Sequence, residues 1–489
     1  VWFNMELNYQ NLDESIEGDV LWPGKDGANA DFETARTDIW NVDSAGMPLV
    51  IVLCQSASDI AKSVLFAKKH EHPMCVHSAG AHSASAVVDD CLVIDLSRLR
   101  KVLVNPKERT VTVSGGATIG DVDDACKPHG LALPMGHVHH TGVAGMALNA
   151  TSGVGYLSRT RGLTVSFLQS VTIIMHDGTI ETIEKDHELF WGLQGAGANF
   201  GVAAEMVFNL SKVAPLNFSG DLVKFPKGEG PGKFLCCINS DKSREELILR
   251  SLNFSLDDKT PVECSSILVV TTNGGPIISR VVYAPQEKNA DQTITQITEM
   301  AKEAFEPLAS YGFSLSNTCK AMPYHDGTQK MAKFAPSSYY QRGSLLGSLP
   351  QNTLDDIVSR VSEMSMDCPV ANMGTAILFQ QLGGELSNMT SNQLPTAGIF
   401  REAKMWVIVV IEFPTGKADP DLRQRCIDWV RETHSIIEPF AIGGKNQKLN
   451  HTSETYGETY GPNTPRLIEL KRKYDPDNVF HFNRNIPLS

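Results

Sequence analysis

The chain has 489 residues, 20% of them charged, and a formal net charge of −13. No basic cluster interrupts this balance, which excludes nucleic acid as an expected partner because cationic side chains bind the phosphate backbone. The longest apolar runs, such as residues 405–411, are far too short to span a bilayer, so we expect no membrane partner either.

Ten cysteines in a chain of this length match neither a disulfide framework nor a zinc spacing, so we expect buried free thiols. The first residues lead into a polar, acidic stretch without the pattern of a signal peptide. We expect a soluble protein, and its compartment stays open between secreted and cytoplasmic. Six N-x-S/T sequons only weakly favour secretion: Asn149, Asn209, Asn217, Asn253, Asn388 and Asn450.

The first part of the chain predicts a strand–helix–strand unit. Its elements are expected in this order: an irregular arm (1–46), a buried strand (48–54), a helix capped by Ser56 or Ser58 and ending near residue 70, and strands over 74–77 and 91–96.

A compact run of small residues, Ser78 to Ser83, follows the strand over 74–77 and carries a single histidine, His82. Exposed backbone N–H groups in such a turn form a nest for anions, which suits a pyrophosphate. We expect a dinucleotide to lie across this histidine loop, with His82 reaching its reactive ring.

A second small-residue segment covers residues 136–159, and a third glycine-rich run covers residues 195–201. Between and after them the pattern predicts strands over 101–104, 110–114, 168–175, 179–183 and 202–210, a helix over 118–127, and a helical turn over 188–191.

Beyond residue 212 the small-residue loops cease, and strands alternate with amphipathic helices. Strands are expected over 265–272, 277–283 and 406–413, and helices over 290–304, 352–364 and 421–437. This pattern is typical of an antiparallel sheet with helices on one face, so the fold class is α+β. We expect three segments: a first part (1–212), a separate domain (213–446) and a loop-like C-terminal part (447–489).

Other nucleotide and metal sites fit poorly. Residues 195–201 nearly match the Rossmann glycine pattern, but they are one residue too long and lie between a helical turn and a strand. No P-loop pattern occurs. His137, His139 and His140 lack a nearby acidic or cysteine ligand, so we expect no metal and predict that they line a pocket.

Several motifs occur together in a fixed order. Residues 78–83 match a histidine loop that usually reads R-x-G-G-H-S, residues 95–97 match D-L-S, residues 189–201 match L-F-W-x-x-x-G-x-G-x-N-F-G, and residues 460–486 match a C-terminal signature. In these features the chain resembles the FAD-linked oxidase family (vanillyl-alcohol oxidase or PCMH-type flavoproteins). Within it, the chain is similar to the berberine-bridge-enzyme-like branch.

The resemblance implies a bipartite PCMH-type FAD-binding domain (1–212 and 447–489) and a substrate domain (213–446), with the pyrophosphate on the small-residue loops. The residues that it places at FAD are Ser78, Ala79, Gly80, Ala81, His82, Ser83, Gly136, His137, Thr141, Gly142, Val143, Gly145, Met146, Ser152, Gly153, Gly155, Tyr156, Gly201, Val202 and Asn450.

The resemblance also implies a covalent bond from His82 to the flavin 8α-methyl group. Many members add a second bond through a cysteine, and Val138 stands at that position here. We therefore expect a single covalent bond. The arginine and one glycine of the usual histidine loop are replaced by Ser78 and Ala81, which leaves the individual FAD contacts open.

The implied reaction is hydride transfer from a small organic alcohol or amine to flavin N5, followed by reoxidation with O2 and release of H2O2. A general base usually removes the alcohol proton. The branch's familiar glutamate base matches Pro395 here. Either the substrate is an amine that arrives deprotonated, as residues 449–454 suggest by likeness to amine-oxidising members, or Tyr339 or Tyr340 acts as the base. Asn450 is expected near flavin and substrate.

Two alternatives to an oxidase stay open. The first is a dehydrogenase or a redox-neutral cyclase, which would use the same flavin without O2; the missing glutamate mildly favours this alternative. The second is a flavoprotein or binding module without catalytic activity.

Overall fold

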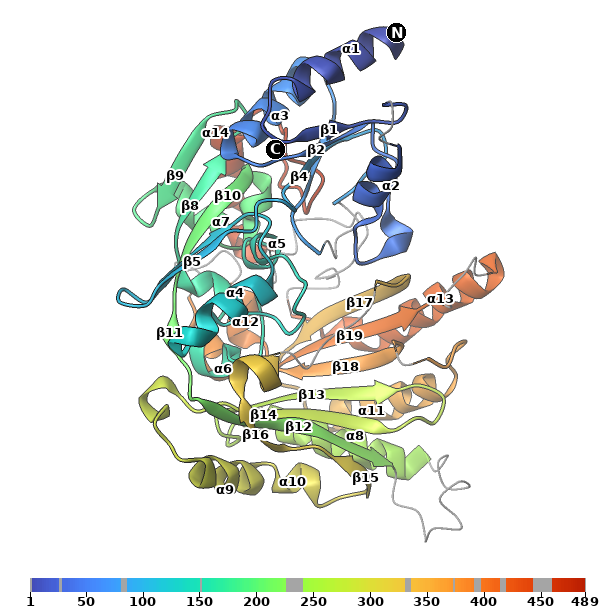
Figure 1. Cartoon of the computed structure of the whole chain (residues 1–489). Coiled ribbons are helices and arrows are strands. Elements are labelled where there is room, and N and C mark those ends of the chain that lie inside the picture. The colour runs from blue at the N-terminus through green and yellow to red at the C-terminus, as the bar shows by residue number, and fades with distance from the viewer. Residues whose placement is uncertain are drawn as a thin grey trace.

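The structure is a computed structural model of the chain. It describes residues 2–25, 29–80, 86–149, 152–225, 241–329, 336–372, 374–390, 397–413, 419–442 and 460–488. Figure 1 shows the N-terminal third at the top and a large sheet with its helices below it.

The first sheet has four strands in the order β1-β2-β4-β3, and the histidine loop lies in the chain between β3 and β4. Strands β2, β4 and β3 are parallel, and β1 joins the edge antiparallel to β2. Ser56 caps α3 by accepting a hydrogen bond from the Asp59 N–H, as its sequence predicts. The elements are α1 (Trp2–Asp13), β1 (Asp19–Leu21), α2 (Asn29–Thr37), β2 (Val50–Leu53), α3 (Ala57–Lys69), β3 (Met74–His77) and β4 (Leu92–Asp95).

The expectation of an irregular arm over residues 1–46 is wrong, because this stretch forms α1, β1 and α2. The arm lacks a marked apolar stripe, so periodicity does not reveal it. Strand β1 exists through pairing with β2, about 30 residues further along the chain, and such long-range pairing leaves no local signal.

A five-stranded antiparallel sheet of order β5-β6-β10-β8-β9 follows. Thr118 closes a capping box with Asp121 at the start of α4, which fits the predicted helix start. The elements are β5 (Val102–Asn105), β6 (Thr110–Ser114), α4 (Ile119–Cys126), β7 (Leu131–Ala132), α5 (Val143–Ala147), α6 (Ser158–Arg161), β8 (Leu168–Ile174), β9 (Ile180–Glu184), α7 (Glu188–Ala196), β10 (Val202–Asn209) and β11 (Ser211–Lys212).

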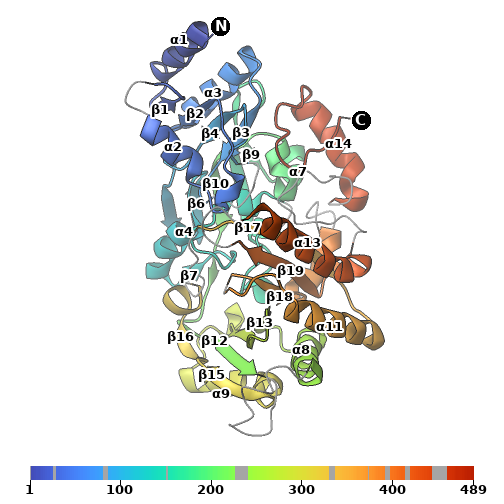
Figure 2. The ribbon, with the colours of Figure 1, turned by 90° about the vertical axis from the view of Figure 1, so that its right-hand side faces the viewer.

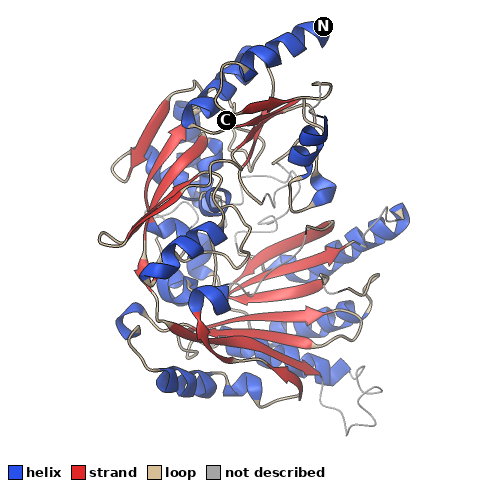
Figure 3. Ribbon diagram, viewed as in Figure 1, coloured by secondary structure: helices blue, strands red, loops and turns tan. Residues whose placement is uncertain are grey.

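The large sheet has eight strands, all antiparallel to their neighbours, in the order β15-β12-β14-β13-β18-β19-β17, with β16 also pairing with β12. Figure 3 shows these strands as one twisted layer. They are β12 (Leu216–Phe225), β13 (Cys264–Thr271), β14 (Ile277–Tyr283), β15 (Phe313–Asn317), β16 (Lys320–Pro323), β17 (Tyr339–Leu346), β18 (Ala376–Gln381) and β19 (Met405–Glu412).

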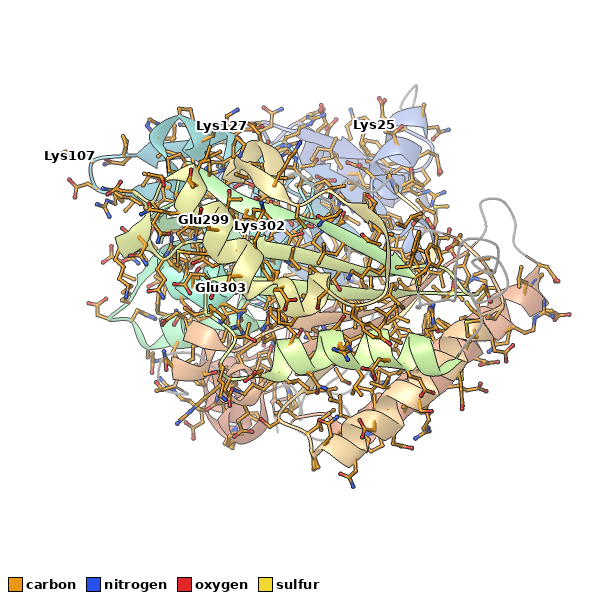
Figure 4. All side chains as sticks on the ribbon, turned by 90° about the horizontal axis from the view of Figure 1, so that it is seen from below. Lys25, Lys107, Lys127, Glu299, Lys302 and Glu303 are labelled. Atoms are coloured by element: carbon orange, nitrogen blue, oxygen red, sulfur yellow. The ribbon has the colours of Figure 1, made fainter. Side chains whose placement is uncertain are left out.

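Helices cover one face of the large sheet. Apolar side chains of α8 (Asp241–Leu256), α11 (Gln351–Met366) and α13 (Pro420–Ile437) form one core with alternate residues of the strands. The helices α9 (Ile294–Ala304) and α10 (Glu306–Ala309) extend that cover under β12 and β14. Figure 4 shows Glu299, Lys302 and Glu303 on the outer, solvent-facing side of α9. The predicted α+β class is confirmed.

The C-terminal residues return to the first part of the chain. Figure 2 shows α14 (Thr464–Tyr474) beside α7. The fully buried Lys471 donates hydrogen bonds from Nζ to the carbonyl oxygens of Asn199 (2.8 Å) and Phe480 (3.0 Å) and pairs with Asp475 (2.6 Å). None of the described helices is long and apolar enough to cross a membrane.

Candidate active site

The histidine loop and the second loop (residues 136–146) lie in direct backbone contact. A Cβ atom on Gly142 would come within 2.6 Å of both the Ala79 carbonyl oxygen and the Ser78 Oγ. A Cβ atom on Gly80 would lie 1.9 Å from the His140 carbonyl oxygen, and Gly80 has a φ of +61°. Both glycines are required by this close approach. The structure therefore brings together the two loops that the sequence assigns to one cofactor.

The second loop is anchored on its other side to α4. Backbone N–H groups of Ile119 and Val143 donate to the carbonyl oxygens of Thr141 and Ala117, each at 2.9 Å. The Gly136 N–H points at the Met146 sulfur, 3.3 Å away. These contacts fix Gly136, Thr141, Val143 and Met146, while Gly145 stays exposed.

Trp40 adds a contact that the sequence does not reveal. Its ring stacks on His140 with a centroid separation of 3.7 Å. Trp40 lies just after α2, in the arm whose structure periodicity misses. In the sequence, the only feature that marks Trp40 is that it is an aromatic residue in a stretch that otherwise predicts a loop.

Residues 152–156, further along the second small-residue segment, pack against the same region. Ser152 is fully buried with a φ of +52°. A Cβ atom added to Gly153 would lie 2.0 Å from the Thr164 Oγ1, and one added to Gly155 would lie 1.7 Å from the Met135 carbonyl oxygen. Tyr156 then places its ring 4.1 Å from that of His137.

Gly201 and Val202 lie deeper than the loops. Gly201 precedes β10, where a Cβ atom would lie 2.4 Å from the Ile174 carbonyl oxygen. Val202 is 1% exposed and packs in the core beside Ile94 and Leu96. Their contact with a cofactor stays a prediction, and their visible role is packing. Ala81, His82, Ser83 and Asn450 lie outside the described residues.

A buried ion pair supports the base of the histidine loop. His77, the last residue of β3, is 0% exposed, and its Nδ1 lies 2.8 Å from the Asp95 Oδ2 at the end of β4. Burial alone would lower the pKa of His77, but the charge and hydrogen bond of Asp95 outweigh burial and raise it. Burial likewise opposes ionisation of Asp95, and the same pairing lowers its pKa.

We expect Asp95→Asn to cost about 3–5 kcal/mol of unfolding free energy, because His77 then loses its buried partner. The pair's contribution falls as pH drops below the ordinary Asp pKa of about 4, and it also falls as pH rises above the ordinary His pKa of about 6.5. Denaturant titrations at several pH values should therefore show the largest difference in unfolding free energy between wild type and variant between about pH 4 and pH 6.5. The exposed Asp90→Asn serves as the control, and a difference that grows above pH 7 would contradict this assignment.

A polar junction joins the second loop to the large sheet. The His137 Nε2 lies 3.5 Å from the Gln380 Nε2 on β18. The Gln329 Nε2 donates to the Gly136 carbonyl oxygen at 2.7 Å. Burial and the positive charge of Arg280 lower the pKa of His137 to about 3, so its imidazole is neutral at physiological pH.

Arg280 itself is neutralised by a two-pronged pair with Asp221, with both N–O distances at 2.8 Å. Burial raises the pKa of Tyr156 beside it, so the phenol also stays neutral. The sequence does not show Gln329, Gln380, Arg280 or Asp221 as site residues. They come from strands and a turn far apart in the chain.

The two candidate tyrosines lie on opposite faces of β17. Tyr340 pairs across the sheet with Ile411 and packs against the core under the helices. Tyr339 pairs with Glu412 and is on the open face of the sheet, the face without the helices. Burial raises the pKa of Tyr339 above its ordinary value, which keeps its hydroxyl protonated.

The loops are compatible with FAD. Glycines or small side chains line the contact between the loops, and neither loop carries an acidic residue that would repel a pyrophosphate. The neutral His137 and Tyr156 lie where the loops meet the sheet, so a flavin ring would meet no opposing charge. Within the described ranges, no group of three or more His, Cys, Asp or Glu side chains could hold a metal ion.

Comparisons with known proteins identify the family of this chain. The FAD binding domain family matches residues 48–184, and the berberine and berberine-like family matches residues 442–487. An FAD-linked oxidoreductase of Aspergillus fumigatus is 30% identical over 487 residues, covering 95% of this chain and 94% of the relative.

Solved structures share the fold over the whole chain. 6-Hydroxy-D-nicotine oxidase from Arthrobacter nicotinovorans aligns with a TM-score of 0.78 and 22% identity over 97% of this chain and 98% of its own. A carbohydrate oxidase from Microdochium nivale aligns with a TM-score of 0.78 and 19% identity over 99% and 100%. The PCMH-type, berberine-bridge-enzyme-like fold predicted from the motifs is confirmed. The chain belongs to the FAD-linked oxidoreductases of the berberine-bridge-enzyme-like branch, and it is an FAD-dependent enzyme.

Proposed function

We propose that the protein is an oxidase of a small organic amine or alcohol, with FAD held by the histidine loop and the second loop and bonded covalently to His82 only. The interlocked backbones of Gly80 and Gly142 carry this proposal, because they build a cradle at the point where the chain enters His82. In this arrangement residues 1–212 and 447–489 form the flavin part, and residues 213–446 bind the substrate.

When bound, FAD would accept a hydride from the substrate at N5 and pass the electrons to O2, which forms H2O2. The chain's own residues orient and shield the reacting groups. His137, neutral and 3.5 Å from Gln380, offers a hydrogen bond without a charge at the junction of loops and sheet. The paired Arg280 and Asp221 keep this wall fixed and electrically balanced.

The described residues favour an amine over an alcohol. Tyr340 is on the helix-covered face of the sheet, where a substrate on the open face would not meet it. Tyr339 is on the open face, but its raised pKa makes it a poor proton acceptor. A free amine needs no base because its nitrogen lone pair already assists hydride departure. 6-Hydroxy-D-nicotine oxidase, similar over the whole chain, is named for an amine substrate.

The second candidate is a dehydrogenase or a redox-neutral cyclase on the same flavin. Its support is the same absence of a familiar base, with proline at position 395. The two candidates differ in their use of O2.

Mixing the flavoprotein with amines and alcohols under argon, and then in air, separates these candidates. We expect the flavin absorbance to bleach under argon with an amine and to return in air with one H2O2 per turnover. If the flavin absorbance returned in air but no H2O2 formed, the result would contradict the proposal of an oxidase. An alcohol that bleaches the flavin faster than its matched amine would contradict the preference for amines.

A further inference from the structure

We propose that the substrate is an uncharged, mainly apolar molecule whose ring system lies on a continuous apolar row across the open face of the large sheet. This inference rests on the proposed function and names its substrate class. It follows from the registers of five strand pairs, which align side chains in rows across the sheet.

The first row contains Asp221, Arg280 and Gln380, the residues that the large sheet contributes to the polar junction already described. It runs across the strands β12, β14, β13, β18, β19 and β17 through directly paired residues. Its members are Asp221, Arg280, Ile267, Gln380, Trp406 and Leu345. This row contacts the second loop through Gln380 and His137, so it marks the side of the sheet next to the flavin cradle.

The second row lies two residues further along every strand, about 7 Å away. Its members are also paired directly across the sheet, and none of them carries a polar side chain: Val223, Ile278, Val269, Leu378, Ile408 and Gly343. The five side chains are all half-exposed, whereas the intervening residues of the same strands, such as Phe379 and Val407, are buried under the helices.

Gly343 adds space at the end of this row. A Cβ atom there would come 3.2 Å from the Trp406 Nε1 and 3.6 Å from an Ile408 side-chain carbon. A side chain at this position would crowd the Trp406 indole and Ile408, so the glycine leaves this end of the row without a projecting group.

Among the described residues, the second row carries no charged side chain and the first row carries only one ion pair. Arg280 and Asp221 neutralise each other, His137 is uncharged, and Glu412 lies two rows beyond the apolar row. A charged substrate would lose its hydration here without gaining a partner. A sugar chain fits poorly for the same reason, since its hydroxyl groups need hydrogen-bond partners that the second row lacks.

The distance between the rows fits the reaction. A molecule of one or two rings that covers Leu378 and Ile408 reaches about 7 Å along the strands to Gln380 and His137. Its reacting C–H bond then lies at the flavin side while its apolar body stays on the second row. Ile408 thus sets which substrates bind, and His137 lies near the carbon that reacts.

The test titrates the flavin-loaded protein under argon with two probes, 1-indanone and cellobiose, and follows the shift of the flavin absorbance on binding. 1-Indanone is an uncharged, mainly apolar bicyclic ketone without an amine or alcohol to oxidise, so it reports binding alone. We expect 1-indanone to bind and cellobiose to cause no shift. In Ile408→Asn, binding of 1-indanone should weaken about tenfold or more, because an amide replaces apolar contact area. Ile408→Thr keeps the β-branched shape and should give an intermediate loss. Leu315→Asn, an exposed apolar position on the edge strand β15, is the matched control and should bind as wild type.

Tighter binding of cellobiose than of 1-indanone overturns the proposal, as does unchanged 1-indanone binding in both Ile408 variants with full flavin content. So does the lack of any shift with 1-indanone in wild type. Each result is read from binding alone. A failure of the oxidase proposal appears separately, as bleaching without H2O2.

Discussion

Replacing Gly80 with alanine is expected to leave a folded protein that has lost nearly all of its FAD. The new Cβ atom would lie 1.9 Å from the His140 carbonyl oxygen, so the histidine loop and the second loop must move apart by about 1 Å. The left-handed φ of +61° adds about 1 kcal/mol of strain for any side chain. Flavin content after gel filtration, read from the visible spectrum, should fall to less than about a tenth of wild type.

Gly130→Ala is the matched control. Gly130 has the same φ of +61°, but a Cβ atom there meets nothing within 4 Å. It therefore carries the backbone strain without the clash, and it should keep full flavin content. Equal flavin loss in both variants would show that strain in the backbone, not contact between the loops, is the cause. Full flavin content in Gly80→Ala would contradict the cradle itself.

His82→Ala is expected to release all of its flavin on acid precipitation, whereas wild type should keep its flavin in the pellet. The reason is the single covalent bond, since Val138 stands where many relatives carry a second, cysteine link. The variant should still bind FAD before denaturation, because the cradle of Ser78–Gly80 and Gly142 is unchanged. Loss of the bond should also lower the flavin reduction potential.

His129→Ala, an exposed histidine beside α4, is the control and should behave as wild type. Flavin that stays in the His82→Ala pellet would show a bond at another residue. Flavin released entirely from wild type would show that FAD is bound without a covalent bond.

Local signals predicted the elements between residues 50 and 210 well, but not the N-terminal arm. The Ser56 and Thr118 caps, the strand at 74–77 and the paired strands β8 and β9 all lie where their residues indicate. Elements that depend on distant partners were missed. Strands β12, β17 and β18 exist through pairing in the large sheet, and the sequence of α1 has no apolar stripe to mark it.

The candidate site shows the same division. Small residues in the two loops predicted their close contact, because only such residues allow backbones to touch. The choice between Tyr339 and Tyr340 could not be made from sequence, since adjacent residues of a strand point to opposite faces and only the register tells which face is open. The apolar row could not be predicted either, because it is assembled from six strands spread over residues 223–408.

The use of O2 is tested most directly without any substrate. The flavoprotein is reduced under argon with one equivalent of dithionite and then mixed with aerated buffer, while flavin absorbance and H2O2 are followed together. The oxidase account predicts reoxidation within seconds and one H2O2 for each flavin. A flavin that stays reduced for many minutes in air would contradict it and would identify the protein as a dehydrogenase or a redox-neutral enzyme.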